Sequence, residues 1–155
     1  MGLEELERAL AVGTEHDVIE LGGSVPEKSV SEIELHLGVR FPPSYREFVR
    51  RVGFCSILSR EFYGITKSGL FASAIPSVVF ATKSEREAGG LPQELLVIEE
   101  SGGDETFVID TRATRADGEA PVRVWTPAFR DSPDLTAVAA DFGEYLLDAV
   151  EAALT

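Results

Sequence analysis

The sequence predicts an α+β fold, with N-terminal helices, a central antiparallel sheet and a closing C-terminal helix. Apolar residues recur at helical spacing in the first third of the chain. Short β-rich runs separated by turn residues follow, and helical spacing returns near the end. Helices and strands that are segregated in this way are typical of α+β folds. Because the chain has 155 residues, we expect one domain over residues 1–155.

The first helix is expected over residues 3–12. Leu3, Leu6 and Leu10 recur at helical spacing, and glutamates occupy the first turn, where the helix dipole favours negative charge. Residues 13–30 contain three glycines and a proline, so they are expected to form a connector. In this connector, Val18, Ile19 and Leu21 either form one short strand or only pack against the core.

A capping-box pattern predicts that the second helix begins at Ser31. The Ser31 hydroxyl can accept a hydrogen bond from the Glu34 amide, while the Glu34 carboxylate reaches back to Ser31. Val30 and Leu35 occupy the positions of a hydrophobic staple. Gly38 is the expected end of this helix, because glycine adopts the left-handed conformation of a helix terminus at little cost.

The third helix is expected to begin at Pro43 or Ser44, since proline is tolerated in a first turn, and to end at Gly53. One face follows the i, i+3, i+4, i+7 pattern of a buried helix face, with Tyr45, Phe48, Val49 and Val52. The basic zone lies on the other face and the preceding link, with Arg40, Arg46, Arg50 and Arg51. A solvated helix face explains these arginines, and a contact with an acidic patch is the alternative.

Short apolar and aromatic runs after residue 53 predict strands. They cover residues 54–58, 62–65, 95–99, 106–110 and 122–125. The turn residues Ser101-Gly102-Gly103-Asp104 make the third and fourth of these runs a hairpin. A helix is expected over residues 76–87, which begin with proline and precede two glycines.

A long amphipathic helix is expected at the end of the chain. Ser132 and Pro133 would supply its cap and its first position. Its apolar face would pack on the sheet and contains Leu135, Val138, Phe142, Leu146, Val150 and Ala153. The expected order is therefore helices, then an antiparallel meander, then a closing helix.

The charge of the chain excludes several classes of partner. It has 27 acidic and 14 basic residues, and its formal net charge is −13. Nucleic-acid phosphates and anionic membrane surfaces attract basic side chains, so neither is expected as a partner. A basic protein is compatible with this charge.

Features of the sequence favour a cytoplasmic protein. Cys55 is the only cysteine, so no disulfide can form within the chain, and a reducing compartment is favoured. The first ten residues are acidic and lack the basic and apolar regions of a signal peptide. No apolar run approaches the length of a membrane-spanning helix. The oligomeric state is left open, with a monomer favoured.

No motif has the spacing of a catalytic, metal or cofactor site. His16 and His36 have no cysteine partner and no metal-ligand spacing. Cys55 lies in an apolar stretch and is expected to be a buried, inert thiol. We therefore expect no enzyme, no cofactor and no metal. A small hydrolase that uses the acids near Asp104 is the competing hypothesis.

The acidic hairpin is the expected partner-binding surface, with Glu99, Glu100, Asp104 and Glu105 near its turn and Trp125 on the following strand. The turn is expected to be exposed, because buried ionised carboxylates without partners are costly. Tryptophan often anchors interfaces, and charges around it steer association. The alternative is that the acids only solubilise an exposed turn and that Trp125 belongs to the core.

Residues 31–54, SEIELHLGVRFPPSYREFVRRVGF, resemble the entry motif of the SUKH superfamily. This group includes fungal cell-wall-assembly regulators and many bacterial toxin-immunity proteins. The matching positions are Leu37-Gly38, Phe41-Pro42, Tyr45, Phe48 and Val49. The Asn-Gly stop of the family is replaced here by Val52-Gly53.

Three later segments also resemble this superfamily. Residues 96–110, LVIEESGGDETFVID, are similar to its strand, glycine-aspartate turn and strand. Residues 122–125 resemble the following strand, and residues 141–146 resemble the terminal helical segment. The resemblance covers about residues 25–154.

The resemblance implies an α+β fold and a non-enzymatic role. Bacterial members are typically immunity proteins that bind and neutralise a cognate toxin, often a nuclease. A nuclease presents a basic cleft to its substrate, so a partner of this kind would suit an acidic chain. The alternative is an intracellular regulator or scaffold of the cell-wall-assembly type, with no toxin partner.

Overall fold

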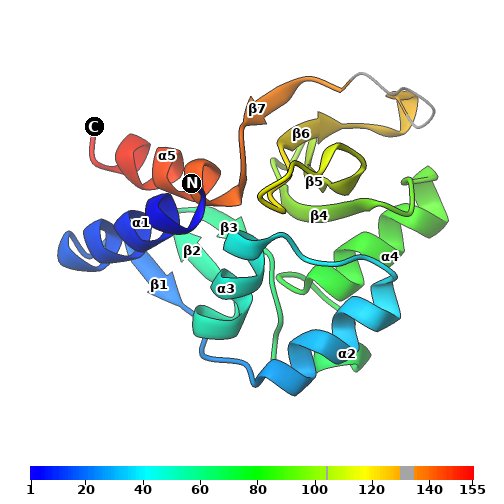
Figure 1. Cartoon of the computed structure of the whole chain (residues 1–155), viewed down its shortest axis with the longest axis horizontal. Helices are drawn as coiled ribbons and strands as arrows, with labels where there is room; N and C mark the ends of the chain where they lie inside the picture. The colour runs from blue at the N-terminus through cyan, green and yellow to red at the C-terminus, as the bar shows by residue number, and fades with distance from the viewer. Residues whose placement is uncertain (104, 130–134) are drawn as a thin grey trace.

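The structure is a computed structural model and describes residues 1–103, 105–129 and 135–155 (Figure 1). Within them lie the helices α1 (Leu3–Glu15), α2 (Glu27–Leu37), α3 (Pro43–Val52), α4 (Val78–Gly89) and α5 (Phe142–Ala153). The strands are β1 (Ile19–Leu21), β2 (Cys55–Ile57), β3 (Arg60–Phe62), β4 (Leu95–Glu100), β5 (Thr106–Asp110), β6 (Val122–Trp125) and β7 (Ala137–Ala139). The predicted α+β fold, with N-terminal helices and a closing helix, is confirmed.

The strands form two antiparallel sheets, where the sequence predicts one. The first sheet has the order β1-β2-β3, and the second has the order β4-β5-β6-β7. The two sheets adjoin just after β3, because the Tyr63 amide donates to the Ile98 carbonyl at 2.8 Å. The first sheet includes the short strand that the connector left open, in which Ile19 pairs with Ile57.

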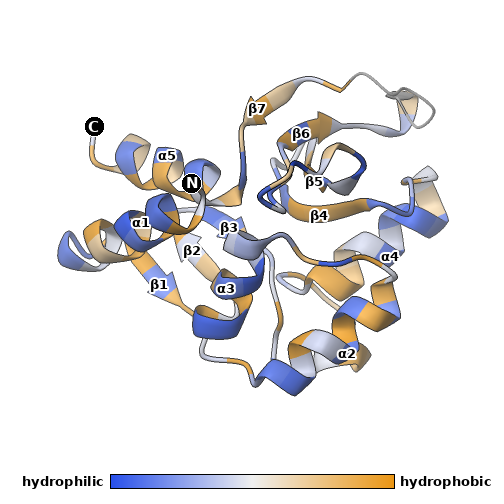
Figure 2. Cartoon of the chain, viewed as in Figure 1, coloured by the Kyte–Doolittle hydropathy of each residue, from blue (hydrophilic) through white to orange (hydrophobic). Residues whose placement is uncertain are grey.

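Helices cover both sheets. α1 and α5 lie side by side next to the first sheet, and α4 packs against β4 (Figure 1). β4 is apolar over most of its length (Figure 2), and its residues from Leu95 to Ile98 are fully buried. A strand that is buried on both faces needs such a continuous apolar run, which explains why β4 shows no alternation.

An aromatic cluster joins α3 to α5 in the core. The ring centroid of Phe142 lies 4.8 Å from that of Phe48 and 5.0 Å from that of Tyr45. The Tyr45 hydroxyl donates to the Tyr63 carbonyl at 2.7 Å, which satisfies a buried polar group. The predicted buried face of α3 and the burial of Phe142 are confirmed.

The predicted start of the second helix is wrong. α2 begins at Glu27, after Pro26, so Ser31 lies inside the helix and caps nothing. The Ser31 hydroxyl instead accepts from Arg46 at 3.1 Å, and the Glu34 carboxylate accepts from the Phe41 amide at 2.7 Å. These contacts with the next segment compete with the capping box. The staple is absent as well, since Leu35 is 84% exposed.

The predicted start of the last helix is also wrong. β7 occupies residues that the helical pattern included, and Val138 is 41% exposed. α5 begins only at Phe142, where the Asp141 carboxylate caps it by accepting from the Glu144 amide at 2.9 Å. Pairing with β6 outweighs the helical spacing of a short alanine-rich segment. Ser132 and Pro133, the expected cap, lie outside the described residues.

β3 lies two residues earlier than the predicted strand over residues 62–65. β2 and β3 form a tight hairpin whose turn consists of Leu58 and Ser59. Leu58 adopts a positive φ of 54°, which leucine rarely does, so no turn could be predicted at this position.

The arginines of α3 are ion-paired within the chain and do not form a free solvated face. Arg46 pairs with Glu27 and with Glu34, both on α2. Arg51 pairs with Glu7 on α1. These three-helix contacts use the basic zone internally, which leaves less of it for an acidic partner.

Candidate partner-binding surface

The structure separates the five residues that the sequence proposes for partner binding. Glu100 and Glu105 are exposed. Glu99 is only 5% exposed and Trp125 is fully buried. The prediction that these two residues lie on the partner-binding surface is therefore wrong. Asp104 lies outside the described residues. Partner binding by the two exposed glutamates stays a prediction.

Trp125 belongs to the core, which is the alternative that the sequence left open. Its indole reaches α4, where Gly89 makes room for it. A Cβ atom added to Gly89 would lie 3.1 Å from the Trp125 ring. A large apolar ring gains more from this burial than from exposure on the strand.

Glu99 is buried because a cation and a hydroxyl accompany it. Arg60 on β3 donates to both of its carboxylate oxygens, at 2.9 and 2.8 Å. The Tyr145 hydroxyl on α5 donates to the same carboxylate. The Arg60 guanidinium also lies 5.0 Å from the ring centroid of Phe62, a cation–π distance. A bidentate arginine pair of this kind offsets the cost of burying the charge.

An open depression lies beside this pair, between the β2–β3 hairpin and the β4–β5 hairpin. Its lining includes Glu61, Glu99 and Glu100 as the acids, Arg60 as the base, and Tyr63, Phe107 and Ile75 as aromatic and apolar walls. The Tyr63 hydroxyl donates to Glu100 at 3.1 Å. Burial, followed by the negative charge of Glu100, raises the pKa of Tyr63, so its hydroxyl keeps its proton at neutral pH.

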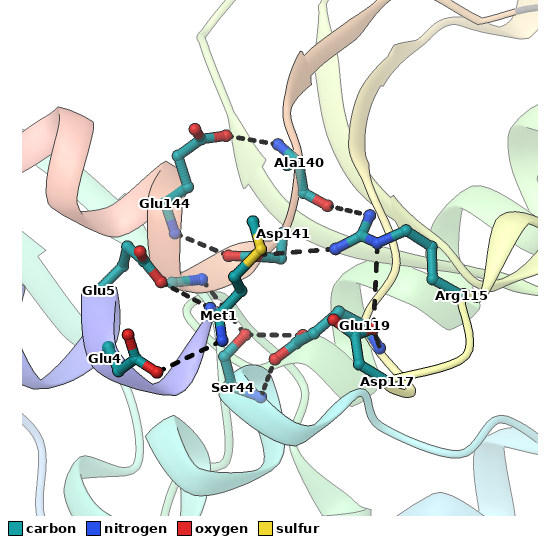
Figure 3. Close-up of polar contacts among 12 residues, drawn as sticks. Met1, Glu4, Glu5, Ser44, Arg115, Asp117, Glu119, Ala140, Asp141 and Glu144 are labelled. Atoms are coloured by element: carbon teal, nitrogen blue, oxygen red, sulfur yellow. Dashed lines mark hydrogen bonds and ion pairs between the residues drawn. The ribbon is translucent and has the colours of Figure 1, made fainter.

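A second buried glutamate, Glu119, has neutral partners (Figure 3). Its carboxylate accepts from the Ser44 hydroxyl at 2.9 Å and from the Ser44 amide at 3.0 Å. The Ser44 hydroxyl in turn accepts from the Gly143 amide at 3.2 Å. Burial raises the pKa of Glu119, because its charge is removed from water.

Asp141 and Arg115 complete this cluster (Figure 3). Arg115 lies 3.7 Å from the Asp141 carboxylate and donates to the Ala140 carbonyl at 2.6 Å. Burial also raises the pKa of Asp141. Backbone closes the cluster, since an added Cβ atom at Gly143 would overlap the Gly2 carbonyl. This cluster therefore joins α1, α3 and α5 to the loop before β6.

Ser44, beside Glu119, and the single cysteine, Cys55, are enclosed. Ser44 is fully buried, and Cys55 is 1% exposed. Burial raises the pKa of the Cys55 thiol, which keeps it protonated and unreactive, as predicted. Among the described residues, no group of three or more His, Cys, Asp or Glu side chains is arranged to hold a metal ion. No helix in the described ranges has the length and apolar character needed to cross a membrane.

A family model described as SMI1-KNR4 cell-wall, named SUKH_5, matches residues 3–151. The chain belongs to the SMI1-KNR4 family. The resemblance read from the motifs is thereby confirmed, and the match to the SMI1-KNR4 family also takes in α1, which precedes those motifs. No curated protein matches the chain.

In this member of the SMI1-KNR4 family, sequence reasoning missed Arg60, Glu61 and Tyr63, which line the depression, and Tyr145, which donates to Glu99. Arg60 and Glu61 lie on a strand that was predicted two residues too late, and Tyr145 lies on α5, 46 residues after Glu99. Glu61, two residues before Tyr63, was a usable signal, but only tertiary contacts bring it to Glu99.

Proposed function

We propose that this SMI1-KNR4 family member is a non-enzymatic cytoplasmic protein that binds and neutralises a cognate toxin, as an immunity protein does. The observation that carries the proposal is the depression, where three carboxylates meet one guanidinium. A basic toxin domain, such as a nuclease, would complement this charge. Complementary charge raises the rate of association by steering, more than it raises affinity.

The exposed acids, and not the buried ones, would form the interface. Glu61 and Glu100 border the depression, and Glu105 is exposed on the same hairpin as Glu100. Glu99 is paired with Arg60 beside these exposed acids. The burial of Ser44 and Cys55, together with the lack of a metal-binding group among the described residues, favours binding over catalysis.

A growth assay tests the proposal. The toxin domain is chosen from a secreted protein encoded beside this chain and is produced in a bacterium with or without the chain. We expect the chain to restore growth and to bind the purified toxin domain. An unrelated acidic protein of similar net charge serves as the control. Absence of both protection and binding for every neighbouring toxin-like domain would contradict the proposal.

A second candidate function is regulation or scaffolding without a toxin partner. The description of the matching family, which refers to the cell wall, favours it. The genomic neighbourhood discriminates between the two functions. A neighbouring reading frame for a large secreted protein with a toxin-like C-terminal end favours immunity, and neighbours of unrelated metabolism favour regulation.

A further inference from the structure

Two carboxylates in the depression lack an ion pair. Glu61 and Glu100 are exposed, and no cation among the described residues pairs with either of them. Acids that line other hollows of the molecule differ in this respect: Glu7, Glu34 and Glu47 each pair with an arginine of α3. The depression is thus a concave surface whose negative charge is left for something outside the chain.

Arg60 shows which chemistry suits this place. Its guanidinium forms two parallel hydrogen bonds with Glu99 and lies 5.0 and 5.8 Å from the ring centroids of Phe62 and Tyr145. A planar cation between a carboxylate and aromatic rings is therefore already accommodated at the floor of the depression. The same two kinds of group, carboxylates and aromatic rings, border its open part.

We propose that the depression is a socket for one arginine side chain of a basic protein partner, held between Glu61 and Glu100. This inference rests on the proposed function, which identifies the partner as a basic protein. The guanidinium would donate to the two unpaired carboxylates in the manner of a fork. The partly exposed ring of Phe107 and the exposed side chain of Ile75 would cover the methylene groups of the arginine.

Arginine fits this socket better than other ligands. An anion would be repelled by the excess of carboxylates, and a neutral side chain would leave their charge uncompensated. An arginine supplies five N–H donors in one plane, which can reach acceptors on both sides of the socket, whereas lysine presents a compact point charge. Hydroxyl groups of Ser59 and Ser101 at the rim provide further acceptors.

Titration of the whole chain with N-acetylarginine amide, followed by NMR at low ionic strength, tests the socket. We expect the largest amide shifts at Glu61, Tyr63 and Phe107, and none of comparable size with N-acetylcitrulline amide, which has nearly the same shape without the charge. Glu61→Gln with Glu100→Gln should weaken binding about fivefold, since two exposed charge pairs are removed.

The matched control replaces two exposed acids outside the depression, Glu20→Gln with Glu32→Gln, and should leave the affinity unchanged. Because all four side chains are exposed, neither double variant should alter the thermal midpoint noticeably. Equal binding of the citrulline probe, shifts spread evenly over the acidic surface, or equal affinity in the two double variants would overturn the proposal.

The outcomes also separate this inference from the proposed function. A chain that binds the arginine probe in the socket but protects against no toxin would refute the immunity role and leave the socket standing. A chain that protects against a toxin but shows no selective shifts in the depression would refute the socket alone.

Discussion

Glu99 and Glu119 are both buried glutamates, but Glu99 has a cationic partner and Glu119 has only neutral partners. Glu99 has a bidentate arginine, Arg60, and lies at the edge of an open depression. Glu119 has only the hydroxyl and the amide of Ser44 and is closed off by backbone. No cation among the described residues forms an ion pair with Glu119.

Acidic residues therefore have three roles in this chain. Glu119 joins the loop before β6 to α3, and through Ser44 to α5. Glu99 holds Arg60 at the floor of the depression, and this ion pair neutralises both charges. Glu61 and Glu100 lie above this floor with their charge uncompensated, and they are the acids available to a partner. A net charge of −13 alone distinguishes none of these roles.

The largest loss of stability is expected when a substitution disrupts the cluster around Glu119. In Gly143→Ala the new methyl group would overlap the Gly2 backbone, which cannot move as a side chain end can. We expect a loss of about 3 kcal/mol in the free energy of unfolding, measured by urea denaturation. Gly103→Ala is the control, because an added Cβ atom there lies 3.9 Å from its nearest neighbour. Equal denaturation midpoints for both variants would mean that the cluster is not closed.

A smaller loss of stability is expected when the cation that pairs with Glu99 is removed. Arg60→Met should lower the free energy of unfolding by about 2 kcal/mol, less than for a fully buried pair because the Arg60 side chain is 41% exposed. Addition of Glu99→Gln should recover part of the loss, since no buried charge then lacks its partner. Arg8→Met, at an exposed arginine of α1 with no ion pair among the described residues, is the control. A loss of the same size in the control would contradict the pairing argument.

A smaller effect concerns the pH dependence of stability at Glu119. Because folding raises the pKa of Glu119, its contribution to stability is present below the ordinary value of 4.5 and is lost as pH rises through the folded value. Glu119→Gln lacks this titration, and at neutral pH it should change stability by less than about 1 kcal/mol. The variant should therefore gain stability relative to wild type as pH rises above 4.5.

Urea denaturation of both proteins at pH values from acid to neutral measures this difference. Asp141 titrates in the same direction in both proteins, so its contribution largely cancels in the comparison. A stability difference that is constant with pH, or that falls as pH rises, would show that Glu119 is not destabilised by its charge.

The sequence predicted those parts of the fold that depend on local signals. Gly38 and Gly53 end helices as expected, because each adopts the positive φ that glycine allows. The strand pair on either side of residues 101–104 is confirmed, because its β-rich runs are long enough to be unambiguous. The interior faces of α3 and α5 follow from periodicity for the same reason.

What the sequence could not predict depends on partners distant in the chain. The first turn of α2 contacts α3, where Arg46 pairs with Glu27 and Glu34. The burial of Glu99 depends on Arg60, 39 residues away. One missed signal was readable: Asp141 and Glu144 have capping-box spacing, and they mark the true start of α5.

Charge reversal compares the unpaired acids inside the depression with exposed acids outside it. Association of the chain with a basic toxin domain is followed by stopped flow at low and high salt, for wild type, Glu61→Lys with Glu100→Lys, and Glu20→Lys with Glu32→Lys. We predict that reversal in the depression slows association about tenfold at low salt and that high salt narrows the difference, because the charges steer the encounter. The control reversal should slow association much less. Equal slowing by both reversals would contradict the claim that this depression, rather than net charge, receives the partner.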